Sequence, residues 1–569
     1  MKAKWGRVLI LFVLSISFVV LYTQLEAETA AQSAQLDRLT KGTATAEDVL
    51  NVLLNQGLPV DQAVMMVAQH SIEKLGKDPA TVAREVTNAV VSKTRAADVP
   101  QAIEQAAKGL MQGAVQAAAN QNKDVNSMVQ QVSSAGAQAA VNASVDKGVP
   151  AAEAAKASAA GNTSGAVAGA VAAKQDVGSV TQAATSGNAD GAIQAAVNKG
   201  QDVSQVAKAS SSGSSEAAVQ AAVDNKQDVA AISKSAANGS ADGAVKGAAT
   251  TGQNVNNIIS ASSAGATEGA VRGALDAKQD LKTVTNSASQ GSAQGAVESA
   301  VENKQNVADV AKASASGSTQ GATQAAVDNK QDVAAVAQSA SSGSAQGAVQ
   351  AASDTKQNVS QVTQATSSGS TEGAVVAAVA TKSGVDAIVQ SVAQGTTQGA
   401  AQGASDSGQS VTVATQAATS GASQGATQGA QESGLNATNL SQVANTAATT
   451  QQNNTVVAPT TVVATTVATT VPPATTTVAT TIATTIATTS VATSVATTVP
   501  VTTVATTTVP PTVAPTTAAT TSAASTTTAT TVAPTTSVAT TTVPTTISTT
   551  TSSSSSTTST TTSVKPPSG

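Results

Sequence analysis

The chain has 569 residues and a formal net charge of −5, with 41% hydrophobic, 11% charged and 1% aromatic residues. All four aromatic residues, Trp5, Phe12, Phe18 and Tyr22, lie within the first 22 positions. The rest of the chain therefore lacks the large rings on which enzyme cores usually draw. The absence of cysteine excludes disulfides, thiol catalysis and cysteine-bound metals, and the single histidine, His70, excludes sites built from several histidines.

Residues 1–27 have the pattern of a secretory signal. Three basic residues in the first seven positions precede an apolar run over residues 8–22, and a polar segment then ends at Ala27. The run is shorter than the roughly 20 residues that span a bilayer, so we expect cleavage near Ala27, with an uncleaved membrane anchor as the alternative. Cleavage would change the formal charge from −5 to −7, because it removes three basic residues and Glu26.

The segment that follows is interpreted as a linker over residues 28–44 and a helical N-terminal cap over residues 45–96. Three helices are expected in the cap, because each has a capping residue or a proline at its start. These starts are at Thr45, Pro59 and Asp78. His70 falls in the second helix, and we interpret it as a structural residue because no partner ligand lies near it in the sequence.

A 26-residue period governs residues 97–435, which hold about 13 copies of one unit. A glutamine followed by Asp or Asn recurs at Gln175, Gln201, Gln227, Gln253, Gln279, Gln305, Gln331 and Gln357. Glycines keep the same spacing from Gly161 to Gly421, and most copies have a second glycine four residues later. The regularity identifies a tandem repeat protein.

The copy over residues 201–226 indicates the local structure of the unit. Asp202 is a good N-cap, and the valines after it recur at helical spacing. We expect Gly213 to adopt a positive φ and end that helix, with Ser214 as the cap of a second one that stops at Lys226. Each repeat is thus predicted to be a hairpin of two short helices.

The predicted fold class is all-α, an α-solenoid of about 13 short helical hairpins. One alternative is a continuous right-handed coiled coil, since 26 residues in seven turns give about 3.71 residues per turn. Paired glycines argue against it, because each costs about 1 kcal/mol inside a helix. The other alternative, a β-solenoid, is suggested by the Gln, Asn, Gly and Ser content, but the period-2 alternation of strands is missing.

Residues 436–569 have a different composition, dominated by Thr, Val, Ala, Ser and Pro. No charged residue lies between Glu432 and Lys565, and no glycine lies between Gly434 and Gly569. The composition resembles that of the O-glycosylated stalks of secreted and cell-surface proteins. We predict a disordered Thr/Pro-rich tail, either as a glycosylated stalk or unmodified.

The candidate sites are a set of register-matched aspartates and four glycosylation sequons. Five aspartates occupy the same repeat position and would form a ladder able to bind Ca²⁺: Asp176, Asp202, Asp228, Asp280 and Asp332. Helix capping explains them more simply, because asparagine replaces the aspartate in other copies and keeps the cap. Glycosylation sequons begin at Asn142, Asn162, Asn238 and Asn436. We predict no catalytic, cofactor-binding or metal-binding residues.

These features favour a non-catalytic, exported structural repeat protein of the cell surface or extracellular matrix, acting as a spacer, adhesin or matrix component. A protein that binds a lattice or glycan (ice, mineral or polysaccharide) and a self-assembling fibre subunit are the alternatives. Expected partners are other envelope or matrix components, a surface or glycan, or copies of the chain. A mildly acidic chain without a basic cluster is not expected to bind nucleic acid, and membrane contact is expected only if the N-terminal segment stays uncleaved.

Overall fold

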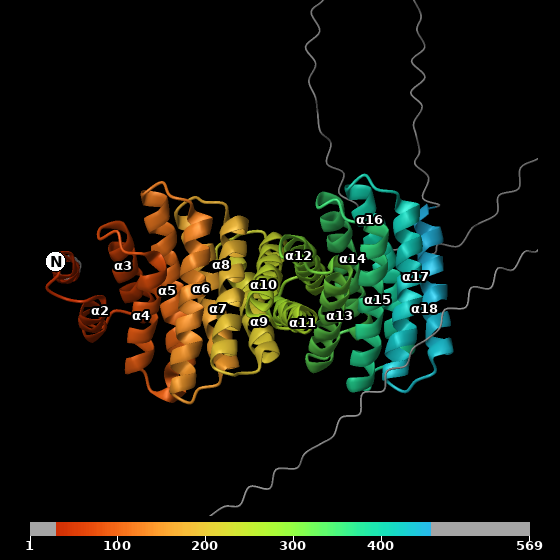
Figure 1. Cartoon of the computed structure of the whole chain (residues 1–569), viewed down its shortest axis with the longest axis horizontal. Coiled ribbons are helices and arrows are strands. Elements are labelled where there is room, and N and C mark those ends of the chain that lie inside the picture. Colours follow the sequence, from red (N-terminus) through yellow and green to blue (C-terminus); the bar gives the residue numbers. More distant parts are fainter. Residues whose placement is uncertain (1–29, 457–569) are drawn as a thin grey trace, which may run out of the picture. The chain divides into compact units, whose positions relative to one another are not determined.

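Each 26-residue repeat forms one long helix in the computed structural model, which describes residues 30–456 (Figure 1). Helix α9 runs over Val203–Asp224 and passes through Gly213 and Ser214 without interruption. The predicted hairpin of two short helices is therefore wrong, as is the helix end predicted at Gly213. No strand occurs between residues 30 and 456, so this part of the chain is all-α, as predicted, and is not a β-solenoid.

Before the repeats, residues 30–40 are helical, and α2 (Ala46–Asn55), α3 (Val60–Glu73), α4 (Pro79–Lys93) and the short 3₁₀ helix η1 (Ala96–Asp98) follow. The repeat helices are α5 (Val99–Asn120), α6 (Val125–Asp146), α7 (Ala151–Ala172), α8 (Val177–Asn198), α9, α10 (Val229–Thr251), α11 (Val255–Asp276), α12 (Leu281–Glu302), α13 (Val307–Asp328), α14 (Val333–Asp354), α15 (Val359–Ala380), α16 (Val385–Asp406), α17 (Val411–Glu432) and α18 (Ala437–Val456).

The turn between α9 and α10, residues 225–228, shows how consecutive helices are joined. Lys226 adopts a left-handed conformation with φ 55°, and the N–H of Gln227 donates to the carbonyl of Ala222 at 2.8 Å. This is the Schellman arrangement that closes many helix C-termini. Asp228 then caps α10 by accepting a backbone N–H bond. The repeated Gln-Asp dipeptide thus ends one helix and begins the next.

The predicted caps and helix ends at the repeat boundaries are confirmed. The Asp202 side chain accepts a hydrogen bond from the backbone N–H of Gln205 at 3.0 Å. Asparagine takes the same role at Asn254, where it caps α11. Glycine occupies the left-handed position in some copies, as at Gly200 (φ 60°), and lysine occupies it in others.

The helices form two layers, and the chain reverses direction at each turn. Figure 1 shows the connections alternating between the two ends of the helices. Each of the helices α3 to α17 packs most extensively against a helix two places away along the chain, so that α5, α7, α9 and α11 follow one another in one layer and α6, α8, α10 and α12 in the other. The last helix, α18, packs most against α17. This arrangement is an α-solenoid and excludes a continuous coiled coil. α3 and α4 begin the two layers by packing against α5 and α6.

Glycines in the middle of the helices allow unusually close packing within each layer. A Cβ built on Gly265 of α11 would lie within 3.0 Å of the carbonyl oxygen of Lys208, which is 57 residues earlier in α9. The same offset links Gly213 to Lys156 and Gly317 to Ser260. We call this line of contacts the glycine seam. Close backbone approach adds dispersion contacts along the seam, which offset the cost of about 1 kcal/mol for each helical glycine.

Between the two layers, the core consists of small side chains. Val206, Ala218 and Ala222 are among the buried residues that α9 contributes. Buried hydroxyl groups join them: the Oγ atoms of Ser211 and Ser262 lie 2.7 Å apart. Since the apolar side chains that each helix buries are mainly alanines and a few larger aliphatic residues, its stability must come from its neighbours in the array.

Both flanking segments are more helical than predicted. Residues 30–40 are helical within the expected linker, and α18 extends the array into the segment expected to be tail. Leu440, Ala444 and Ala448 lie on one face of α18 and are buried against α16 and α17. The predicted signal segment, residues 1–27, and the rest of the predicted tail, residues 457–569, lie outside the described residues.

Candidate functional site

Each repeat helix carries a row of mainly polar side chains beside its glycine seam, at 6, 10, 14 and 18 residues after the N-cap. We call it the outer row. In the layer that contains α9, charged members of this row pair across neighbouring helices. Lys208 Nζ lies 3.0 Å from Glu268 Oε2, and Lys312 Nζ lies 2.8 Å from Glu372 Oε2. The outer row thus adds a polar ladder to the apolar contacts within the layer.

The other layer builds its outer row mainly from amides and hydroxyls. Gln130 donates to Ser186 Oγ at 3.1 Å, and Gln182 donates to Asn238 Oδ1 at 2.9 Å. Because these groups are satisfied within the protein, most of the row stabilises the layer and leaves few hydrogen-bonding groups for a partner. A ligand site therefore requires an interruption of the row.

One interruption is a groove of about 530 Å³ over α7, which we call the α7 groove. Its floor includes Ala160 and Ser164, which occupy outer-row positions where α9 has Ser212 and Glu216. Short side chains on α7 thus leave a hollow between the longer side chains of the two flanking helices. Glu104 lies on one side of it, from α5.

The α7 groove is rich in acidic groups. Burial raises the pKa of Glu104, and the nearby charge of Glu216 raises it further. Glu216 is itself held by Lys156 at 3.1 Å and by Arg272 at 3.8 Å. The groove therefore favours positively charged groups over anions, and its charges are largely arranged into ion pairs within the protein.

The aspartates predicted to form one ladder are divided between the two ends of the helices. Asp176 and Asp228 begin α8 and α10, whereas Asp202 begins α9, which runs in the opposite direction. Hydrogen bonds from Ser179 lower the pKa of Asp176, as expected for a capping carboxylate. Among residues 30–456, no group of three or more His, Asp and Glu side chains is placed to hold a metal ion.

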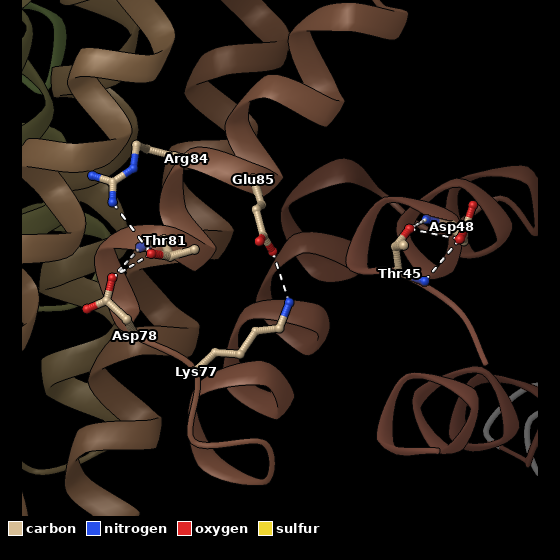
Figure 2. A network of polar contacts seen from close by, with 7 residues as sticks. All are labelled: Thr45, Asp48, Lys77, Asp78, Thr81, Arg84 and Glu85. Atoms are coloured by element: carbon tan, nitrogen blue, oxygen red, sulfur yellow. Dashed lines mark hydrogen bonds and ion pairs between the residues drawn. The ribbon is translucent and has the colours of Figure 1, made fainter. Parts of the chain in front are cut away.

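The N-terminal cap has its own polar contacts, which Figure 2 shows. Thr45 and Asp48 form a reciprocal capping box at the start of α2, and Lys77 pairs with Glu85 at 3.1 Å. His70 Nε2 lies 2.7 Å from Thr40 Oγ1, a contact that joins α3 to the helix over residues 30–40. This contact fits a structural role for His70, and burial lowers its pKa.

The four glycosylation sequons differ in exposure. Asn162 and Asn238 are 1% and 6% exposed, inside the packed array, and Asn142 is half-buried. Asn436 is exposed, and its side chain caps α18 by accepting a hydrogen bond from Asn439 N at 3.2 Å. A glycan on Asn162 or Asn238 is incompatible with the packing seen here.

Comparisons with known proteins identify no family for the chain. No protein-family model matches the chain, and no curated protein matches it. One solved structure with similarity is described as a "Circular tandem repeat protein with novel repeat topology and enhanced subunit contact surfaces". It is 13% identical, the match covers 72% of this chain and 98% of that one, and the TM-score is 0.20. Within residues 30–456, no helix combines the length and apolarity needed to cross a bilayer.

Proposed function

We propose that the chain is an exported, non-catalytic structural repeat protein that acts as a spacer at the cell surface or in the extracellular matrix. The observation that carries this proposal is the glycine seam, which packs each of the helices α7 to α17 against the helix two places earlier in the chain with the same 57-residue offset. Arrays of this kind gain length by adding units, and their stability is a sum over neighbouring contacts. Such a body suits a role that depends on extent more than on one site.

Export is supported by the composition of two segments, residues 1–27 and residues 436–569. The basic and apolar pattern of residues 1–27 is typical of a secretory signal, and the Thr-rich segment is typical of surface stalks. Partners are then other envelope or matrix components, or copies of the chain.

Localisation in the cells that make the protein tests the export part of the proposal. The protein is expected at the surface or in the medium, with a new N-terminus near Ala27, and a variant that lacks residues 8–22 is expected to stay inside. Recovery of the unmodified chain in the cytoplasm contradicts export. A surface-bound chain that retains Met1 supports the uncleaved anchor instead.

Two deletions of equal length test the spacer role. Removing residues 227–278 or residues 305–356 takes away two helices and their turns from different places in the array. If the chain is a spacer, either deletion is expected to shorten the helical array by the same amount and to reduce its activity at the cell surface or in the matrix to the same degree. A complete loss with one deletion and none with the other would point to a local binding site.

The glycan-binding alternative is favoured by one observation, a second interruption of the outer row. It lies in the layer that contains α4, α6, α8 and α10.

A further inference from the structure

A hollow of about 280 Å³ opens on the outer row of α4, α6, α8 and α10. Its lining includes Arg84 from α4, Gln138 from α6, Asp190 from α8 and Lys246 from α10. We call it the Asp190 hollow. Its location is independent of the spacer role, because it interrupts the outer row and leaves the glycine seam intact.

Asp190 is the distinctive group of this hollow, since it is only 8% exposed. Its Oδ1 accepts a hydrogen bond from Gln194 Nε2 at 2.7 Å, and Gln194 Oε1 in turn accepts one from Gln138 Nε2 at 2.7 Å. Because the carboxylate can only accept, this chain fixes the orientation of both amides. No hydrogen bond to Asp190 Oδ2 comes from any residue in the described range 30–456, although the side chain lines the hollow.

The two cations of the hollow also lack carboxylate partners. Among the described residues, neither Arg84 nor Lys246 forms an ion pair within 4.0 Å, and the hydrogen bond of Arg84 is to Thr81 Oγ1 at 3.5 Å. Lys246 is near enough to lower the pKa of Asp190, which burial raises. The hollow is therefore lined by a nearly buried carboxylate and by two exposed cations, neither of which has a carboxylate partner among the described residues.

The glutamines around the hollow present acceptors to its interior. Gln130 and Gln131 use their amide N–H groups on Ser186 and Ser127, as Gln138 does on Gln194. No described residue donates a hydrogen bond to their carbonyl oxygens or to Asp190 Oδ2, so these oxygens can accept from a ligand. A matching ligand brings several hydroxyl groups for these acceptors and one anionic group for Arg84 or Lys246.

We propose that the Asp190 hollow binds a small polyhydroxy carboxylate of the uronic acid class. The carboxylate of the sugar acid meets one of the two lining cations, Arg84 or Lys246, and its hydroxyl groups donate to Asp190 and to the glutamine carbonyls. A neutral sugar has no charge for either cation, and an amino acid brings an ammonium group that both cations repel. The hollow opens on the surface, so the sugar acid can be free or part of a polysaccharide.

Titration of the full chain with sodium D-glucuronate, followed by calorimetry or ligand-observed NMR, tests this proposal. Saturable binding is expected, with D-glucose and L-serine at least about tenfold weaker, as expected from one lost charged hydrogen bond. A uronate trisaccharide that binds more tightly than the monosaccharide identifies a polysaccharide as the source. Equal affinity identifies the free sugar acid. No saturable binding of either uronate, or equal binding of glucose or serine, overturns the proposal.

Variants locate the site and keep the test independent of folding. Asp190→Asn and the double variant Arg84→Gln/Lys246→Gln are each expected to weaken glucuronate binding by about tenfold or more. Asp242→Asn is the matched control, because Asp242 has the same repeat position in α10 but instead accepts a hydrogen bond from Ser186 at 2.6 Å. Circular dichroism and thermal unfolding confirm that each variant is folded. Unchanged binding by folded Asp190→Asn, or an equal loss in Asp242→Asn, overturns the assignment.

Discussion

Replacing seam glycines by alanine separates the two roles that a helical glycine can have. Alanine favours a helix over glycine by about 1 kcal/mol, so a glycine without a packing role should stabilise the protein when it is replaced. Gly136 in α6 is such a position, because an added Cβ there would meet Leu110 Cδ2 at an ordinary 3.4 Å. Gly136→Ala is expected to raise the free energy of unfolding by up to about 1 kcal/mol.

Gly265→Ala is expected to have the opposite effect. The added Cβ would lie within 3.0 Å of three backbone atoms of Lys208, and backbone, unlike a flexible side chain, cannot move aside alone. Overpacking of this kind costs about 1–3 kcal/mol, and the close contact places it near the upper end. After subtraction of the helix preference, about 2 kcal/mol of net destabilisation remains.

Urea unfolding of the two single variants and the parent, followed by far-UV circular dichroism, measures this contrast. Opposite shifts of the midpoint support the seam. If both variants are stabilised, helix preference alone governs these positions and the close approach is wrong. If both are destabilised to a similar degree, the glycines act as turn residues, as the sequence first suggested.

Three further results are expected. Deleting residues 227–252 removes one helix and moves every later helix into the other layer, so it should lower the urea midpoint more than deleting residues 227–278, which removes two. Lys226→Gly should stabilise the protein by about 0.5–1 kcal/mol in thermal unfolding, because Lys226 has φ 55°. Asp190→Asn should be more stable than the parent at pH 7, and this difference in the free energy of unfolding should shrink as the pH falls towards the ordinary aspartate pKa of 3.8. The reason is that burial raises the pKa of Asp190, so the parent regains stability as this carboxylate is protonated. A constant difference across the pH range contradicts the burial of a charged Asp190.

The features that sequence predicts well are those set by neighbouring residues. The cap at Asp202 and the helix end near Lys226 depend on local backbone chemistry, and both are confirmed. The 26-residue period and the helical content follow from them. The same two signals also fit the two ends of one 22-residue helix. The second cap predicted at Ser214 is therefore not needed, which is why the hairpin prediction was wrong.

Neighbouring residues do not show whether the seam glycines end a helix or allow close packing. The carbonyl that Gly213 contacts belongs to Lys156, 57 residues earlier in the chain, and no local pattern identifies it. A glycine at a repeated position is compatible with a positive φ and with close packing, and only the neighbouring helix in the same layer decides between them. The four-residue spacing of the glycines, which keeps them on one helical face, is the signal that favours packing.

Candidate sites were missed for a related reason. Asp190 and Lys246 lie on different helices of one layer, so their proximity depends on knowing that alternate repeats are neighbours. The short side chains of α7 are visible in the sequence, but their meaning depends on knowing which positions form the outer row. α18 was assigned to the tail because of its threonines, although Leu440 and Ala444 already showed helical spacing.

A disulfide between Ser211→Cys and Ser262→Cys tests the central claim most directly. The two hydroxyl oxygens lie 2.7 Å apart, on α9 and α11, and the natural chain has no cysteine to interfere. The two-layer arrangement predicts rapid intramolecular cross-linking of the double-cysteine variant under mild oxidation in the folded protein, and little in urea. The two single-cysteine variants, which cannot form this bond, are the controls. Failure to cross-link in the folded state, or equal cross-linking in urea, would contradict the packing of each helix against the second helix along the chain.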